Sequence, residues 1–222
     1  SSGIQVEMRE IVLRDKAPEF IETSPTATVP CLKVKELIVD ESLHIMDWAL
    51  GQNDPENLMQ MPTEGYALMS TCDGPFKQAL DRYKYPNKFS DIDPIENRDA
   101  ASDFIHELEQ CLDGNLFGQD PKLADFAILP FIRQFAHVDL DWFSTQPWEK
   151  TKVWLQNFKD SARFKAIMDK YPKWVKTTLK EIVKGGFMES HYDAEHNYMV
   201  LWLASLENKR RSELYAYDKK GK

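Results

Sequence analysis

Cysteine is scarce in this 222-residue sequence, and no two cysteines form a C-x-x-C pair. Cys31, Cys72 and Cys111 are odd in number and widely spaced, which argues against both a disulfide framework and a zinc site. We therefore expect a cytoplasmic protein that binds no metal, because the cytoplasm keeps thiols reduced.

Basic residues are outnumbered, and no apolar run is long. The chain has 28 Lys and Arg against 36 Asp and Glu, a net charge of −8. Proteins that bind nucleic acids generally concentrate Lys and Arg to release counterions, so we expect no nucleic-acid partner. The longest apolar run, residues 198 to 204, is far shorter than the ~18 to 20 residues that span a bilayer, and we expect no membrane partner. The sequence begins at Ser1 rather than Met and shows no leader, which leaves open whether a segment is missing upstream.

The composition that is present predicts one or two globular domains. Hydrophobic residues make up 42% of the chain, enough for one large core or two small ones. Residues 53 to 62 form a polar linker framed by prolines and mark the best domain boundary. We predict one domain at residues 1–52, a second at 63–184, and a C-terminal extension of unknown structure at 185–222.

The first of these domains reads as β-α-β-β-α. Residues 4 to 13 alternate apolar and polar side chains at first and predict a strand, and residues 14 to 21 predict a short helix. Residues 31 to 35 and 37 to 40 predict a hairpin, and residues 41 to 50 predict a helix with one apolar face. The second domain is helical throughout, with helices expected at 63–83 (broken at 73–75), 94–112, 122–136, 148–160 and 162–171, and further helix to 183.

Two short motifs of the first domain suggest a ligand site. A proline before a strand removes an amide donor, and a cis bond there would turn the backbone of Val29 outward to pair with an extended ligand. Glu41 and Ser42 stand where the following helix begins, beside unpaired amides and the positive end of the helix dipole. Such a site could take an amino-acid head group, with Ser42 and the amides on its carboxylate and Glu41 on its ammonium.

These motifs, in this order, resemble the bacterial members of the glutathione S-transferase family. The resemblance runs from about residue 4 to 175 and includes Asp73-Gly74-Pro75, Leu123-Ala124-Asp125-Phe126 and Phe164-Lys165-Ala166 of the helical half. It implies an α+β fold, with a thioredoxin-like N-terminal domain followed by an all-α domain of the glutathione S-transferase C-terminal type. The N-terminal domain lacks the first strand and helix of that family, which carry the catalytic residue, so the catalytic residue stays unassigned.

The resemblance also implies a function, a site and partners. We expect glutathione as co-substrate, transferred to a small electrophile or used to reduce a disulfide, and a homodimer as the working unit. The implied glutathione-binding residues are Val29, Pro30, Glu41, Ser42 and Lys16. A non-catalytic binding or interaction module with the same fold is the alternative.

Other reactive side chains have a structural interpretation beside the functional one. Cys31 is either a nucleophile or a small core residue, and Lys16 either binds a glutathione carboxylate or is a solvated helix end. His106-Glu107 lacks the second His of a zinc-protease motif, and the group around His191 and His196 matches no regular metal site. The Trp and Phe residues between 126 and 158 form core or wall an apolar pocket.

Two further expectations concern helix 122–136 and the tail. Lys122 stands where the family has the Ser or Thr of a capping box with Asp125, so we expect the reciprocal cap to be lost. Residues 198 to 203 form an apolar run of strand length, and a charged segment follows at 206–217. This β-α order could replace the lacking strand and helix as a circular permutation, with residues 205–209 at the catalytic corner; a loosely docked tail is the alternative.

Overall fold

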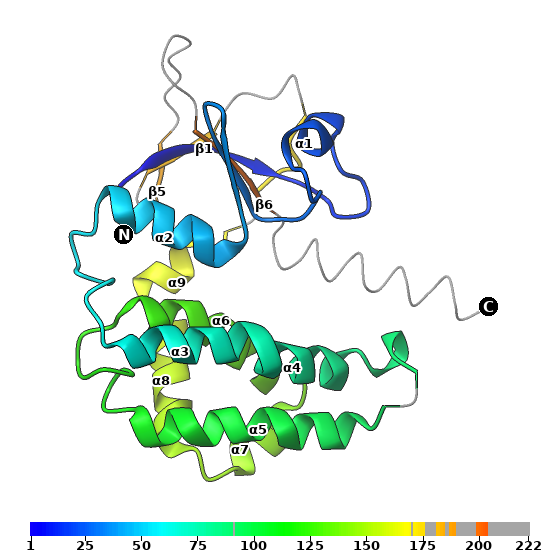
Figure 1. Ribbon diagram of the computed structural model, residues 1–222, viewed down its shortest axis with the longest axis vertical. Helices are drawn as coiled ribbons and strands as arrows, with labels where there is room; N and C mark the ends of the chain where they lie inside the picture. The colour runs from blue at the N-terminus through cyan, green and yellow to red at the C-terminus, as the bar shows by residue number, and fades with distance from the viewer. Residues whose placement is uncertain (91, 170, 176–180, 185–186, 190–198, 204–222) are drawn as a thin grey trace. The chain divides into compact units, whose positions relative to one another are not determined.

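The computed structural model describes residues 1–90, 92–169, 171–175, 181–184, 187–189 and 199–203 (Figure 1). The chain divides into two compact units: Ser1–Glu56 together with Ala162–Lys222, and Asn57–Ser161. The first unit is thus assembled from both ends of the chain, and the second is continuous. The sequence-based boundaries assigned residues 162–184 to the helical half, whereas the structure groups them with the first unit.

Among the described residues, a six-stranded sheet forms the centre of the first unit. Its strands lie in the order β3-β2-β6-β1-β4-β5. Their bounds are β1 (Gln5–Glu10), β2 (Cys31–Val34), β3 (Leu37–Asp40), β4 (Glu181–Lys184), β5 (Phe187–Glu189) and β6 (Met199–Leu203). The predicted continuation of helix to residue 183 is therefore wrong, because β4 pairs antiparallel with β1.

Strand β6 bears out the strand alternative for the apolar tail segment at residues 199–203, rather than the loosely docked tail. It lies parallel to β1, with Glu7 opposite Val200, and antiparallel to β2, with Leu32 opposite Leu201. An apolar segment suits this position because a central strand is covered on both faces. The predicted helix at 206–217 and the proposed catalytic corner at 205–209 lie outside the described residues.

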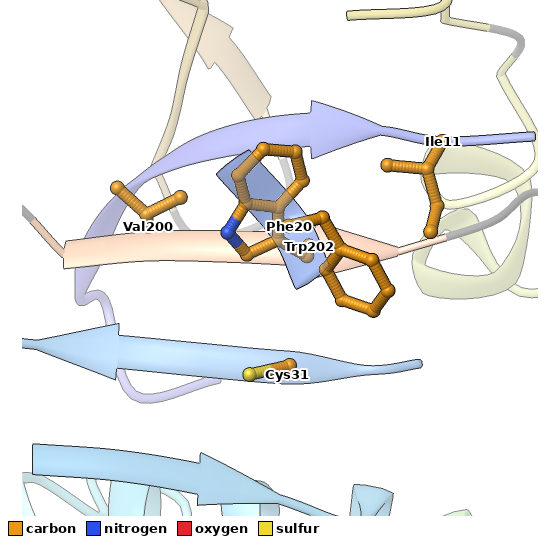
Figure 2. Close-up of a cluster of buried hydrophobic side chains, with 5 residues drawn as sticks. All are labelled: Ile11, Phe20, Cys31, Val200 and Trp202. Atoms are coloured by element: carbon orange, nitrogen blue, oxygen red, sulfur yellow. The ribbon is translucent and has the colours of Figure 1, made fainter. Parts of the chain in front are cut away.

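The core of the first unit forms where β6 meets β1, β2 and α1 (Pro18–Thr23). Phe20 of α1 is fully buried, and its ring centroid is 5.5 Å from that of Trp202 (Figure 2). Three further buried side chains complete this cluster: Ile11, Cys31 and Val200. Helix α2 (Ser42–Gln52), close to the predicted 41–50, packs against β2 and β3 and buries Leu50.

The second unit is helical. Its elements are α3 (Thr63–Thr71), η1 (Cys72–Phe76), α4 (Lys77–Lys84), η2 (Pro86–Lys88), α5 (Pro94–Cys111), α6 (Leu123–Ala136), α7 (Leu140–Thr145) and α8 (Glu149–Asp160). The predicted break is confirmed at Gly74, which has φ −96° and ψ −106° just before Pro75, a residue that cannot donate a helical hydrogen bond. The short α9 (Ala162–Ala166), which belongs to the first unit, ends earlier than the predicted 171.

Aromatic side chains fill the centre of the helical unit. Phe135 of α6 lies within 6.4 Å, centroid to centroid, of five other aromatic rings, those of Phe76, Tyr83, Trp142, Phe143 and Trp148. Phe135 and Trp148 are each 1% exposed. Of the Trp and Phe residues between 126 and 158, the core interpretation is confirmed for the four that are buried: Phe135, Phe143, Trp148 and Trp154. The others are half-buried: Phe126, Phe131, Trp142 and Phe158. Among the described residues, no helix has both the length and the apolar character needed to cross a membrane.

Helix α6 keeps half of the capping box whose loss was expected. The Asp125 carboxylate accepts hydrogen bonds from the Lys122 N–H (2.8 Å), the Leu116 N–H (3.0 Å) and the Trp154 indole N–H (3.0 Å). The other half is lost as predicted, because a lysine side chain has no acceptor. Burial raises the pKa of Asp125, and these hydrogen bonds oppose that shift.

Candidate functional site

The hairpin register brings the two sequence motifs together. Cys31 of β2 is paired with Asp40 of β3. Val29-Pro30 directly precedes this pair and Glu41-Ser42 directly follows it, so both dipeptides lie at the same end of the hairpin. The Val29–Pro30 peptide bond is cis, the geometry on which the ligand-binding interpretation of Val29 depends.

Glu41 and Ser42 begin helix α2 with both side chains exposed. Glu41 is the N-cap residue, and its side chain does not cap the helix. Its carbonyl accepts the first helical hydrogen bond, from the Ile45 N–H at 3.1 Å. Glu41 has φ 65° and ψ 132°, a backbone conformation that residues with a side chain rarely adopt. An exposed carboxylate and an exposed hydroxyl thus stand at a helix N-terminus, where the dipole favours anions.

Lys16 lies just before α1, and its side chain is half buried. Its ammonium donates a hydrogen bond to the carbonyl of Ala27 at 2.9 Å. Ala27 has φ 52° and belongs to the loop that leads into Val29. Lys16 therefore fixes this loop, a role that sequence reasoning did not assign to it.

A chain of polar side chains also fixes the loop, and sequence reasoning missed it. The Thr26 hydroxyl donates to the Asp40 carboxylate at 3.2 Å and lies 2.5 Å from the Thr28 hydroxyl. The buried Ser24 hydroxyl donates to the Thr28 carbonyl at 3.4 Å. The alternation of hydroxyl residues at 24, 26 and 28 is the one sequence signal for this arrangement. Asp40 thereby connects the loop before Val29 to the end of β3, next to Glu41.

Cys31 is a core residue, as its structural interpretation predicted. It belongs to the buried cluster around Trp202. Burial is the main cause that raises the pKa of its thiol, and the nearby Asp40 carboxylate adds to this while a hydrogen bond with Ser24 opposes it. A thiol with a raised pKa is a poor nucleophile at neutral pH because the thiolate is the reactive form. The three cysteines, all of them in the described part of the chain, form no disulfide.

The other reactive groups considered from the sequence do not join this site. The His106 side chain is on α5 of the second unit, with its ring 5.4 Å from that of Trp148. His191 and His196 lie outside the described residues. Among the residues that the structure describes, no three His, Cys, Asp or Glu side chains are grouped as a metal would require.

Comparison with known proteins shows which family the N-terminal segment resembles in sequence. Residues 1–57 match the sequence model of the family described as "Glutathione S-transferase, N-terminal domain". A comparison with curated proteins finds no match. The N-terminal segment is therefore similar in sequence to the glutathione S-transferase N-terminal domain.

Solved structures extend the likeness beyond that segment. A glutathione transferase family member from Pseudomonas fluorescens Pf-5, with two glutathione bound, superimposes with a TM-score of 0.57 at 16% identity, over 72% of this chain and 90% of that one. A glutathione S-transferase from Actinobacillus pleuropneumoniae gives 0.54 at 16% identity, over 68% and 72%. A delta-class glutathione transferase from Nilaparvata lugens gives 0.53 at 23%, over 66% and 71%. The chain has the glutathione S-transferase fold, a thioredoxin-like domain with an all-α domain.

Proposed function

We propose that this protein binds glutathione at the end of the β2–β3 hairpin and uses it as co-substrate, either transferring it to a small electrophile or reducing a disulfide. The observation that supports this most comes from the hairpin register, in which Cys31 is paired with Asp40. Val29–Pro30 directly precedes this pair, and the exposed Glu41–Ser42 pair directly follows it. Glutathione carries both an extended peptide backbone and a free amino-acid head group, which these two motifs suit.

Each proposed residue has a distinct task. The backbone of Val29, positioned by Pro30, pairs with the ligand's peptide groups. The Ser42 hydroxyl and the α2 amides bind the head-group carboxylate, and Glu41 binds its ammonium. Lys16 has three donors, of which one is used on Ala27, and the others suit a second ligand carboxylate. These residues bind and orient the ligand; a neighbouring donor or dipole that lowers the pKa of the glutathione thiol would supply the reactive thiolate.

The double substitution Glu41→Ala with Ser42→Ala tests the binding site. Removing two charge-assisted contacts should weaken glutathione binding by about 2 to 4 kcal/mol, measured by calorimetry. Glu64→Ala with Ser70→Ala, two exposed residues on α3, makes the same chemical change in the second unit and should leave the affinity unchanged. Unaltered affinity in the first variant would remove Glu41 and Ser42 from the site.

Turnover distinguishes the enzyme from a binding module of the same fold. Glutathione conjugation to a generic aryl halide, followed with the wild-type protein, should proceed well above the uncatalysed rate. Glutathione binding without turnover of this electrophile or of a model disulfide would favour the module.

We also propose a cytoplasmic homodimer, on the strength of the family resemblance. Light scattering at micromolar concentration should return about twice the chain mass of 25.8 kDa. A monomer mass would refute the dimer without affecting the glutathione site.

A further inference from the structure

Strand β6 lies inside the sheet, between β2 and β1. In the order β3-β2-β6-β1-β4-β5, it is the strand that joins the hairpin to β1. It is also distant in sequence from both neighbours, since β1 and β2 lie within the first 34 residues. The backbone hydrogen bonds of the hairpin's inner edge therefore depend on a segment from the other end of the chain.

The register of β6 connects it to the candidate site. Trp202 is paired with Cys31, the residue that directly follows Pro30. On the other side, Cys31 is paired with Asp40, the residue before Glu41. The first residue of β2 is thus held between β6 and β3. Any displacement of β6 removes one of the two strands that fix the position of Val29–Pro30.

Side chains fix β6 at this point of the sheet. Trp202 is 1% exposed, with the Phe20 ring 5.5 Å and the Trp174 ring 5.1 Å from its own centroid. The Arg9 guanidinium lies over both tryptophan rings, at 4.6 Å from Trp174 and 4.9 Å from Trp202. A 2.8 Å ion pair with Glu7 holds Arg9 in turn. Figure 2 shows the Trp202 ring beside Phe20 in this cluster.

We propose that β6 is a structural part of the glutathione site and that Trp202 is a positioning residue for Val29–Pro30. Docking of β6 and binding of glutathione are then coupled equilibria, each favouring the other to the same extent. The proposal rests on the proposed function, because it concerns affinity at that same site. It gives β6 a role in ligand binding that does not require direct contact between β6 and glutathione.

Amide hydrogen exchange of the wild-type chain tests the coupling without any substitution. If opening of β6 abolishes binding, glutathione at 100 times its Kd should slow exchange of the Val200–Leu203 amides about 100-fold. Buried amides of α5 in the second unit, such as those of Ile105 and Leu108, serve as the internal control and should slow much less. Binding of glutathione with no slowing in β6, or with no more slowing there than in α5, would overturn the proposal.

A set of matched variants tests the positioning role of Trp202. Trp202→Ala should raise the Kd of glutathione at least tenfold, and Trp202→Phe, which keeps an aromatic ring against Phe20, should restore most of the affinity. Trp148→Ala removes an equally buried tryptophan from the second unit and should leave the Kd within about twofold. A folded Trp202→Ala protein with wild-type affinity would overturn the proposal. If this variant does not fold, the exchange experiment decides. If the wild-type protein does not bind glutathione at all, the proposed function itself is refuted. If it binds glutathione but the affinity does not depend on β6, only the role of β6 is refuted.

Discussion

At the residue scale, Glu41 combines a proposed ligand contact with an unfavourable backbone. Its φ of 65° with ψ of 132° is a region populated mainly by glycine, and conformations of this kind cost of order 1 to 3 kcal/mol. The side chain is exposed and makes no capping bond that would offset this cost within the fold. An observed conformation of this kind justifies a functional hypothesis, and here the hypothesis is a carboxylate held at a helix N-terminus for a ligand ammonium.

Two substitutions at this position should separate stability from binding. Glu41→Gly relieves the backbone conformation, whereas Glu41→Ala retains it, and both remove the carboxylate. We expect Glu41→Gly to be about 1 kcal/mol more stable than Glu41→Ala in urea unfolding, after allowing for the greater chain entropy of glycine. Both variants should lose glutathione affinity to the same extent. Equal stability of the two variants would show that the backbone strain at Glu41 is no larger than the entropy cost of glycine, about 1 kcal/mol.

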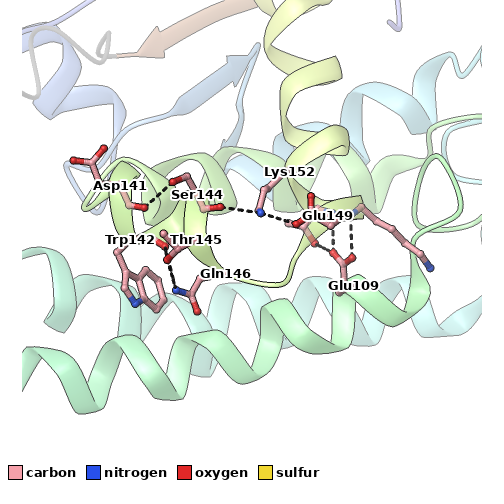
Figure 3. A network of polar contacts seen from close by, with 10 residues as sticks. Glu109, Asp141, Trp142, Ser144, Thr145, Gln146, Glu149 and Lys152 are labelled. Carbon is pink, nitrogen blue, oxygen red and sulfur yellow. Dashed lines mark hydrogen bonds and ion pairs between the residues drawn. The ribbon is translucent and has the colours of Figure 1, made fainter.

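At the element scale, one carboxylate connects two helices of the second unit. Glu109 near the end of α5 accepts hydrogen bonds from the N–H groups of Lys150 (2.9 Å) and Thr151 (2.8 Å) and from the Thr151 hydroxyl (2.8 Å), at the first turn of α8 (Figure 3). Burial acts to raise the pKa of Glu109, but these hydrogen bonds outweigh it and the pKa is lowered. An anion at a helix N-terminus also interacts favourably with the helix dipole.

The pH dependence of this contact can be predicted with its sign. A carboxyl group whose pKa is lowered by folding contributes stability above its unfolded pKa, near 4.5, and loses it as the pH falls through the folded pKa. We expect Glu109→Gln to cost about 2 kcal/mol of unfolding free energy at pH 7 and progressively less below pH 4.5. Urea unfolding of both proteins across this range measures the difference. A difference that stays constant with pH would mean that the charge of Glu109 is not what stabilises α8.

The sequence predicts an element well when the interactions that form it are between residues close together in the chain. The hairpin, α2 and the break at Gly74 follow from local patterns and proline positions, and each lies within a few residues of its predicted bounds. Strand β4 was read as helix because its pairing with β1 is a contact between opposite ends of the chain. The two site dipeptides were found as motifs. The Thr26–Asp40 bond was missed because it depends on the hairpin register rather than on either residue.

At the scale of the whole molecule, one unit is formed by a continuous segment of the chain and the other by two separate segments. Asn57–Ser161 is continuous and buries its own apolar residues, among them Ile105, Leu108, Leu123 and Ile132, each at 0% exposure. The other unit requires both ends of the chain. Residues 1–56 supply β1, β2 and β3, but β6 lies between β1 and β2 in the sheet.

This difference predicts opposite behaviour of fragments. Residues 57–161 alone should give a helical circular dichroism spectrum and unfold cooperatively in urea. Residues 1–56 alone should not fold, because without β6 and β4 the strand β1 has no neighbour, and Ile11, Phe20 and Cys31 lose the packing of Val200 and Trp202. A chain of this length also buries too little apolar surface to be stable by itself. Mixing the fragment with residues 162–222 should restore protected amides in β1 and β2, read by hydrogen exchange. A fragment 1–56 that protects these amides alone would show that the tail strand is dispensable for the sheet.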